Sequence, residues 1–159
     1  MDPDPSSRVS VSASRAWRVS TAKLVHAVTS ALDAHGRTEG EVAVRLCGDS
    51  EIQALNRRYR GLDEPTDVLT FASAGGEGSP LGDVAIAVPF ARRQAEARGV
   101  ALDLEIAYLA MHGALHLLGF DDERETERAE MLSEMNRIAR LAGLPEDPEW
   151  GSLLHGGAA

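Results

Sequence analysis

The chain has 159 residues, a length that predicts one domain over 1–159 with loose ends at about 1–7 and 155–159. A hydrophobic share of 43% suffices for a core, and the single cysteine, Cys47, excludes a disulfide framework. The net charge of −9 argues against a typical nucleic-acid-binding protein, which is usually basic.

This charge is unevenly distributed, with 12 basic and 13 acidic residues in 1–100 and 4 and 12 in 101–159. A basic surface on the first hundred residues is therefore compatible with the total. No apolar run approaches the ~20 residues of a membrane span. Residues 1–14 lack the apolar core of a signal peptide. We therefore expect a cytoplasmic protein with no membrane partner.

Hydrophobic periodicity predicts strands and helices in mixed order. The expected elements are a strand at 8–12, a helix at 20–34, a strand at 41–47, a helix that begins at Asp49 or Ser50, strands at 66–72 and 83–88, and helices at 89–99, 102–118 and 123–142. The apolar face of the second helix should include Ile52, Leu55 and Tyr59. This order predicts an α+β fold or a layered α/β/α sandwich. The helix at 102–118 is apolar nearly all round, so it should lie in the middle of the domain.

Two histidines, His112 and His116, stand four residues apart on this central helix and so share one face. That spacing lets both imidazoles bind one metal ion. Gly119 can end the helix and allow the chain to fold back, which would return Asp122 to the histidine face. Two histidines and one carboxylate leave an open position on zinc, as catalytic sites require.

Each of these residues also has a simpler interpretation. The histidine pair can be hydrogen-bonded within the core, although two imidazoles in an apolar helix are costly unless satisfied. Asp122 and Glu125 match an N-terminal capping box for the last helix, and Asp121 can cap it instead. The sequence alone leaves Asp122 as a metal ligand or a helix cap.

The spacing H-x-x-x-H-x-x-G-x-x-D imitates that of zinc peptidases, but one group is missing. Those peptidases carry a glutamate after the first histidine as general base, and here that position is Gly113. A peptidase is therefore the least favoured activity.

Three arginines, Arg57, Arg58 and Arg60, lie close together near the end of the second helix. Such a cluster is most often a solvated basic face. Arg60 differs because it stands at the turn before Gly61. A metal site and an arginine together suit attack on a phosphodiester, since the metal polarises the group and the arginine offsets developing charge.

Three sequence blocks resemble, in content and in order, the YbeY family of bacterial rRNA maturation factors. The blocks are L-N-x-x-Y-R-x-x-D-x-P-T-D-V-L-T-F at 55–71, G-D-V-A-I at 82–86 and H-G-A-L-H-L-L-G-F-D at 112–121. The resemblance covers about residues 40–140. It implies an α+β domain with a small mixed sheet, here four-stranded and packed with about five helices.

The resemblance also implies an activity and a setting. Members are described as metal-dependent, single-strand-specific endoribonucleases that act on the 3′ end of 16S rRNA in 30S maturation and quality control. The expected cofactor is one Zn²⁺ per chain, and the expected partners are rRNA and the 30S subunit or its proteins.

By this resemblance the family's first two metal histidines match His112 and His116, and its invariant arginine matches Arg60. Arg60 and His112 are then the catalytic candidates, with Arg60 also binding substrate. The third ligand departs from the family, because most members have histidine where this chain has Asp122. A carboxylate makes the metal a weaker Lewis acid and favours harder ions. The rival hypothesis is a ribosome-assembly partner whose metal is structural.

Overall fold

The computed structural model describes residues 8–37, 40–75 and 79–152. The loose ends predicted at 1–7 and 155–159 lie outside these residues. Nine elements follow one another along the described chain: β1 (Val9–Ala13), α1 (Ala22–Ala34), β2 (Val42–Cys47), α2 (Asp49–Arg60), β3 (Val68–Ala72), β4 (Gly82–Ala87), α3 (Val88–Arg98), α4 (Leu102–Leu117) and α5 (Glu125–Leu141). The predicted order of strands and helices is confirmed.

The four strands form one mixed sheet in the order β1-β2-β4-β3. β1, β2 and β4 run parallel, whereas β3 pairs antiparallel with β4 and forms an edge, with Val68 opposite Ile86. The expected α+β fold, with a small mixed sheet and five helices, is thereby confirmed.

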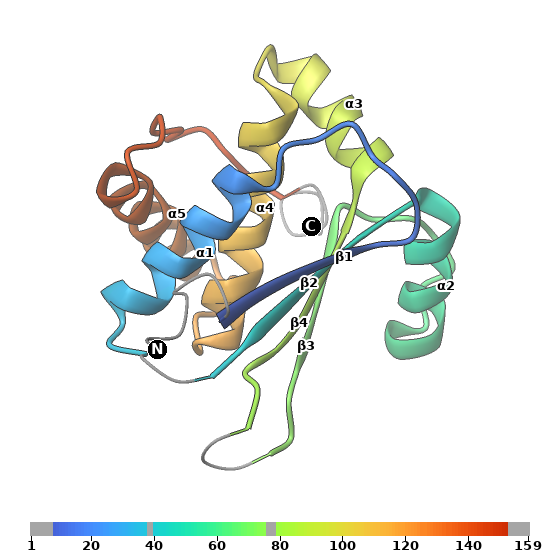
Figure 1. Cartoon of the computed structure of the whole chain (residues 1–159), viewed down its shortest axis with the longest axis horizontal. Helices are drawn as coiled ribbons and strands as arrows, with labels where there is room; N and C mark the ends of the chain where they lie inside the picture. The colour runs from blue at the N-terminus through green and yellow to red at the C-terminus, as the bar shows by residue number, and fades with distance from the viewer. Residues whose placement is uncertain (1–7, 38–39, 76–78, 153–159) are drawn as a thin grey trace, which may run out of the picture.

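Helices cover the two faces of the sheet unequally (Figure 1). α1, α4 and α5 lie on one side and α2 on the other. Side chains alternate between the faces as a pleated strand requires: Val84 and Ile86 of β4 join the large core, and Ala85 and Ala87 join the small one. We call these the α4 face and the α2 face.

α4 is the central apolar helix that the sequence predicted. Every residue from Glu105 to Leu115 is buried, so the helix touches protein on all sides. Among the described residues no single helix is long and apolar enough to cross a membrane; α3 and α4 meet that test only as a pair bent by 116°.

Two local expectations differ from the structure. Tyr59, expected on the buried side of α2, is 57% exposed, and its ring packs edge-on against Phe71 at 5.1 Å. The last helix begins at Glu125, two residues later than predicted. This later start changes the interpretation of Asp122.

Candidate metal centre

The two histidines of α4 and Asp122 meet in a small triangle of ligand atoms. His116 Nε2 lies 3.2 Å from His112 Nε2 and 3.1 Å from Asp122 Oδ2. The third side, from His112 Nε2 to Asp122 Oδ2, is 3.3 Å. Among the described residues this trio is the group of three that could hold a metal ion. The structure therefore brings together all three residues that the sequence nominated as ligands.

A turn at Gly119 brings Asp122 to the histidines. α4 ends at Leu117, and Gly119 has a φ of +104°, a conformation that glycine adopts without strain. The Phe120 amide then donates back to the Leu115 carbonyl at 3.0 Å. The returning chain is held in place by Asp121, whose Oδ1 accepts the amides of Asp122 at 2.8 Å and Glu123 at 3.3 Å.

Asp122 is not the cap of the last helix. α5 has Arg124 at its N-cap position, and the Arg124 amide donates to the Glu127 side chain at 3.2 Å. The capping alternative for Asp122 is therefore wrong, and so is that for Asp121, which closes the preceding turn. The side chain of Asp122 is 4% exposed and faces the two histidines.

The triangle has the dimensions of a metal site. With zinc–ligand distances of about 2.0–2.1 Å, tetrahedral geometry separates neighbouring ligand atoms by roughly 3.3 Å. Nδ1 of His116 donates to the Phe120 carbonyl at 3.1 Å, so neutral His116 turns a lone pair toward Asp122. Two acceptors 3.1 Å apart need a cation or a shared proton between them. The residues present thus fit a divalent metal ion.

Burial prepares His112 for this role. It lowers the pKa of His112 below its ordinary value; nearby His116 acts in the same direction, while the hydrogen bond and charge of Asp122 oppose it. A lowered pKa favours the neutral imidazole of His112, which is the form that binds metal. Side-chain exposure is 6% at His112 and 19% at His116, so the triangle faces solvent on the His116 side.

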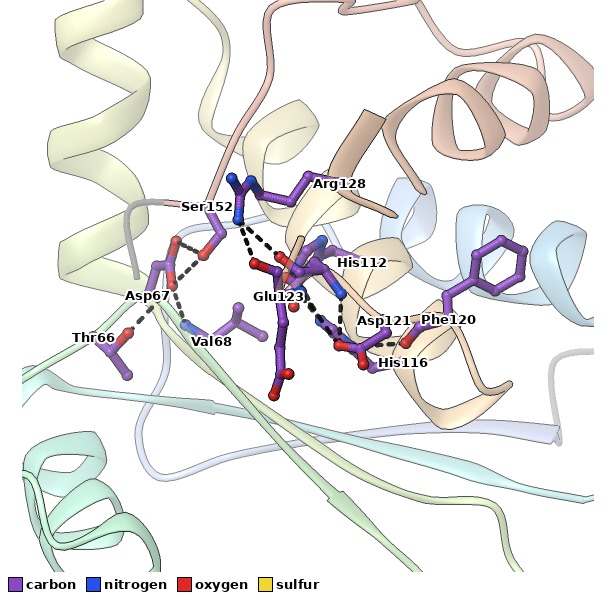
Figure 2. A network of polar contacts seen from close by, with 11 residues as sticks. Thr66, Asp67, Val68, His112, His116, Phe120, Asp121, Glu123, Arg128 and Ser152 are labelled. Carbon is purple, nitrogen blue, oxygen red and sulfur yellow. Dashed lines mark hydrogen bonds and ion pairs between the residues drawn. The ribbon is translucent and has the colours of Figure 1, made fainter. Parts of the chain in front are cut away.

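A second carboxylate, Asp67, acts electrostatically on His112 and was missed by sequence reasoning. It stands directly before β3, is fully buried and accepts the Val68 amide at 2.7 Å and the Ser152 hydroxyl at 2.8 Å (Figure 2). Its negative charge raises the pKa of His112 and so partly offsets the effect of burial. The available signal was a charged residue next to an apolar strand, inside the 55–71 block.

Trp150 also reaches the site from far along the chain. Its ring lies 5.2 Å from the His112 ring, and its Nε1 donates to buried Glu105 at 2.7 Å. The Glu105 pKa is raised, mainly by burial. We call residues 144–152, which follow α5 and carry Trp150 and Ser152, the C-terminal strap. The local sequence pattern of the strap carries no signal for these distant contacts.

Gly113 explains how close α4 lies to the sheet. A Cβ atom at this position would stand 2.6 Å from Val84 Cγ1 and 3.0 Å from Thr70 Cγ2. Position 113 therefore lies directly against the sheet. The glutamate that a peptidase carries at this position would collide with Val84 and Thr70, which strengthens the argument against a peptidase.

Arg60 is the one sequence-predicted site residue that the structure does not bring into the triangle. It is the last residue of α2, is exposed, and belongs to the helix that covers the opposite face of the sheet (Figure 1). Gly61 follows it with a φ of +72° and ends the helix. Its catalytic role stays a prediction.

A family model described as "Endoribonuclease YbeY" matches residues 6–143. The chain belongs to the YbeY family. Members named Endoribonuclease YbeY include those of Synechococcus elongatus, 46% identical over 69% of this chain and 67% of that protein, and Pelotomaculum thermopropionicum, 48% identical over 68% and 76%. The resemblance drawn from the three blocks is confirmed.

YbeY membership agrees with the fold. The solution structure of TM1509 from Thermotoga maritima superimposes with a TM-score of 0.60, at 23% identity over 84% of this chain and 88% of that one. At this identity the likeness concerns the fold alone. The family match ends at residue 143, so the C-terminal strap lies beyond it.

Proposed function

We propose that this YbeY-family chain is a metal-dependent endoribonuclease that cuts single-stranded RNA, acting on the 3′ end of 16S rRNA during 30S maturation. The observation that carries the proposal is the triangle of His112, His116 and Asp122, which supplies three ligand atoms and faces solvent on one side. Three protein ligands with an open side are typical of a catalytic metal, whereas a structural zinc has four. Family membership supports the phosphodiester as the bond attacked.

The proposed cofactor is one Zn²⁺ per chain. Two imidazoles and a carboxylate suit zinc, and a zinc ion in such a site supplies Lewis-acid activation of a water molecule and of a phosphoryl oxygen. The protein contributes the fixed geometry. His116 is oriented by the Phe120 carbonyl, and the negative charge of Asp67 acts on His112.

Arg60 is the proposed substrate-binding and catalytic arginine. The guanidinium is a planar donor fork that matches phosphate, and Arg60 stands with Arg57 and Arg58 in the last turn of α2. A single-stranded RNA that passes the edge strand β3 can contact both faces of the sheet. His112, the more buried of the two imidazoles in the triangle, is the second catalytic candidate through its hold on the metal.

The proposed setting is the cytoplasm, with rRNA and the 30S subunit or its proteins as partners. Family membership supports an RNA substrate. The acidic residues of 101–159 offer a separate surface for a protein partner.

The test combines metal content with RNA cleavage. Purified wild type should contain about one zinc per chain by mass spectrometry and should cut a single-stranded 16S 3′ precursor fragment in a chelator-sensitive way. His116→Ala and Asp122→Ala should lose most of the metal and the cleavage. His26→Ala removes an exposed imidazole on α1 and should change neither, which makes it the matched control.

Clean binding to 30S subunits with no cleavage under any divalent metal would refute the proposal and favour the assembly partner. Full cleavage by metal-free His116→Ala would also refute it.

A further inference from the structure

A cavity of about 270 Å³ opens directly beside the ligand triangle. His112 and Asp122 form part of its wall, so the cavity and the metal centre are continuous. α5 and the C-terminal strap supply the remaining wall, including Arg128, Leu132, Met135 and Trp150. Because the family match ends at residue 143, Trp150 is a feature of the chain beyond the matched region.

The inner wall of the cavity is apolar. Met131, Met135 and Trp150 are each at most 5% exposed, and Trp150 is held by its bond to Glu105. Tyr108 lies 6.0 Å from the Trp150 ring on the side of α4. A wall made of an aromatic ring and thioethers suits a flat, polarisable ring such as a nucleobase.

Arg128 contributes a positive charge to the wall of the same cavity. Its Nη1 donates to the carbonyls of Asp122 at 3.2 Å and Glu123 at 2.9 Å, which fixes the guanidinium next to the metal loop (Figure 2). Both bonds use Nη1, and a guanidinium carries five N–H donors. Arg128 therefore couples the position of Asp122 to a donor group that suits phosphate.

We propose that this cavity is a subsite for one nucleotide of the RNA substrate, with the base against Trp150 and Met135 and the phosphate at Arg128. Its volume lies below the ~300–1,000 Å³ of drug-sized pockets, which suits a single ring system. The phosphate of that nucleotide would then lie beside the triangle, where the cut is made. The identity of the ligand rests on the proposed ribonuclease function.

Glu125 is the exposed acidic residue on the lining, at the start of α5. Its carboxylate is an acceptor for the exocyclic amino group of a base, so the subsite should prefer adenine or cytosine to uracil. This preference separates a built base site from general attraction of anions to Arg128.

The test uses Trp150 as its own reporter. In a Trp17→Phe background, the remaining tryptophan lies on the cavity wall. Titration of zinc-loaded protein with AMP, CMP, UMP and inorganic phosphate should quench Trp150 fluorescence with the nucleotides far more strongly than with phosphate. AMP and CMP should bind more tightly than UMP.

Two variants and one control locate the binding. Ala129→Phe places a ring at an exposed lining position and should abolish the quenching without unfolding the protein. Arg128→Gln should weaken nucleotide binding by roughly tenfold, the usual effect of losing one charged hydrogen bond. Arg124→Gln makes the same charge change at a side chain that is 84% exposed and off the cavity, so it should leave binding unchanged.

The outcomes separate this inference from the proposed function. Nucleotide binding that is lost in Ala129→Phe establishes the subsite even if no RNA is cut. RNA cleavage with no quenching of Trp150, and with unchanged KM in Ala129→Phe, overturns the subsite and leaves the ribonuclease standing. Equal binding of inorganic phosphate and AMP also overturns the base site.

Discussion

The two faces of the sheet differ in what they bury and in what they expose. The α4 face packs 27 buried hydrophobic residues among those described, and it carries the ligand triangle. The α2 face buries five, and next to them lies a groove of about 380 Å³ lined by Leu55, Tyr59 and Phe71. The α4 face thus holds most of the core and the candidate metal ligands. The α2 face has a small core, and its helix carries three arginines in its last turn.

The ligand triangle stands on the better supported of the two faces. The imidazoles of the triangle project from a helix that is buried on every side, so their positions are set by the whole α4 core. The arginines of α2 stand on a helix with two buried residues, Ile52 and Asn56. A flexible cationic surface can follow an RNA strand, whereas a metal centre must hold its ligands within tenths of an ångström.

The largest expected effect is the loss of stability when one buried side chain in each core is shortened to alanine. Leu109→Ala on the α4 face should lower the free energy of unfolding by about 3–5 kcal/mol, because its close-packed neighbours cannot collapse into the space left. Ile52→Ala on the α2 face should cost about 2–3 kcal/mol, because the adjacent groove gives neighbours room to move. Urea unfolding with chelator present measures both without a contribution from metal binding.

A larger loss for Ile52→Ala than for Leu109→Ala would break the comparison, since both side chains are fully buried and differ mainly in their surroundings. Val84→Ala offers an independent check on the α4 face of β4.

The second effect asks whether the α2 face takes part in catalysis. Arg60→Gln should lower kcat/KM for the RNA fragment by roughly 10–100-fold, as expected for losing one donor to a charged phosphate. Metal content should not change, because Arg60 lies on the opposite side of the sheet from α4. Arg57→Gln makes the same change one turn earlier and should have a much smaller effect.

Equal losses for Arg57→Gln and Arg60→Gln would reduce Arg60 to one charge of a general basic surface. An undiminished kcat/KM in Arg60→Gln would confine the catalytic machinery to the α4 face.

The smallest expected effect concerns how seldom the small core on the α2 face is exposed to solvent, which the reactivity of Cys47 reports. Cys47 is buried in its small core, and burial raises the Cys47 pKa to about 12. The thiolate is the reactive form, so at pH 8 the native protein should not react with a disulfide reagent, while the protein unfolded in urea should react at once. Rapid labelling of native protein would show that the α2 face opens often, and its rate would measure how often.

The sequence predicted the elements better than their arrangement. The helix from 102 was located because it is apolar nearly all round, the strand around Val44 because its apolar residues alternate, and the strand around Val84 because it is apolar throughout. The strand order β1-β2-β4-β3 depends on contacts between distant segments, which no local pattern encodes. Tyr59 was wrongly predicted as buried, because helical spacing shows which face of α2 it lies on but not how far the sheet extends beneath that face.

The site residues also divide into those that local spacing reveals and those that depend on contacts between distant segments. His112 and His116 were found because their spacing matches one helical turn, and Asp122 because a glycine turn limits where the chain can return. Its rival role as a cap had the same local pattern, so only the observed start of α5 decided between them. Asp67 and Trp150 belong to the site through long-range packing. Asp67 left only the weak signal of a charge beside an apolar strand, and Trp150 left none.

The absence of a side chain at Gly113 limits which residues this position of the metal helix can accept. A new side chain at 113 would collide with Val84 and Thr70, so that position is constrained by shape. One substitution cannot convert this metal helix into the peptidase arrangement, because the strands underneath would have to change first. A change of Gly113 to glutamate is therefore opposed first by sterics in the sheet, before any chemistry at the metal is altered.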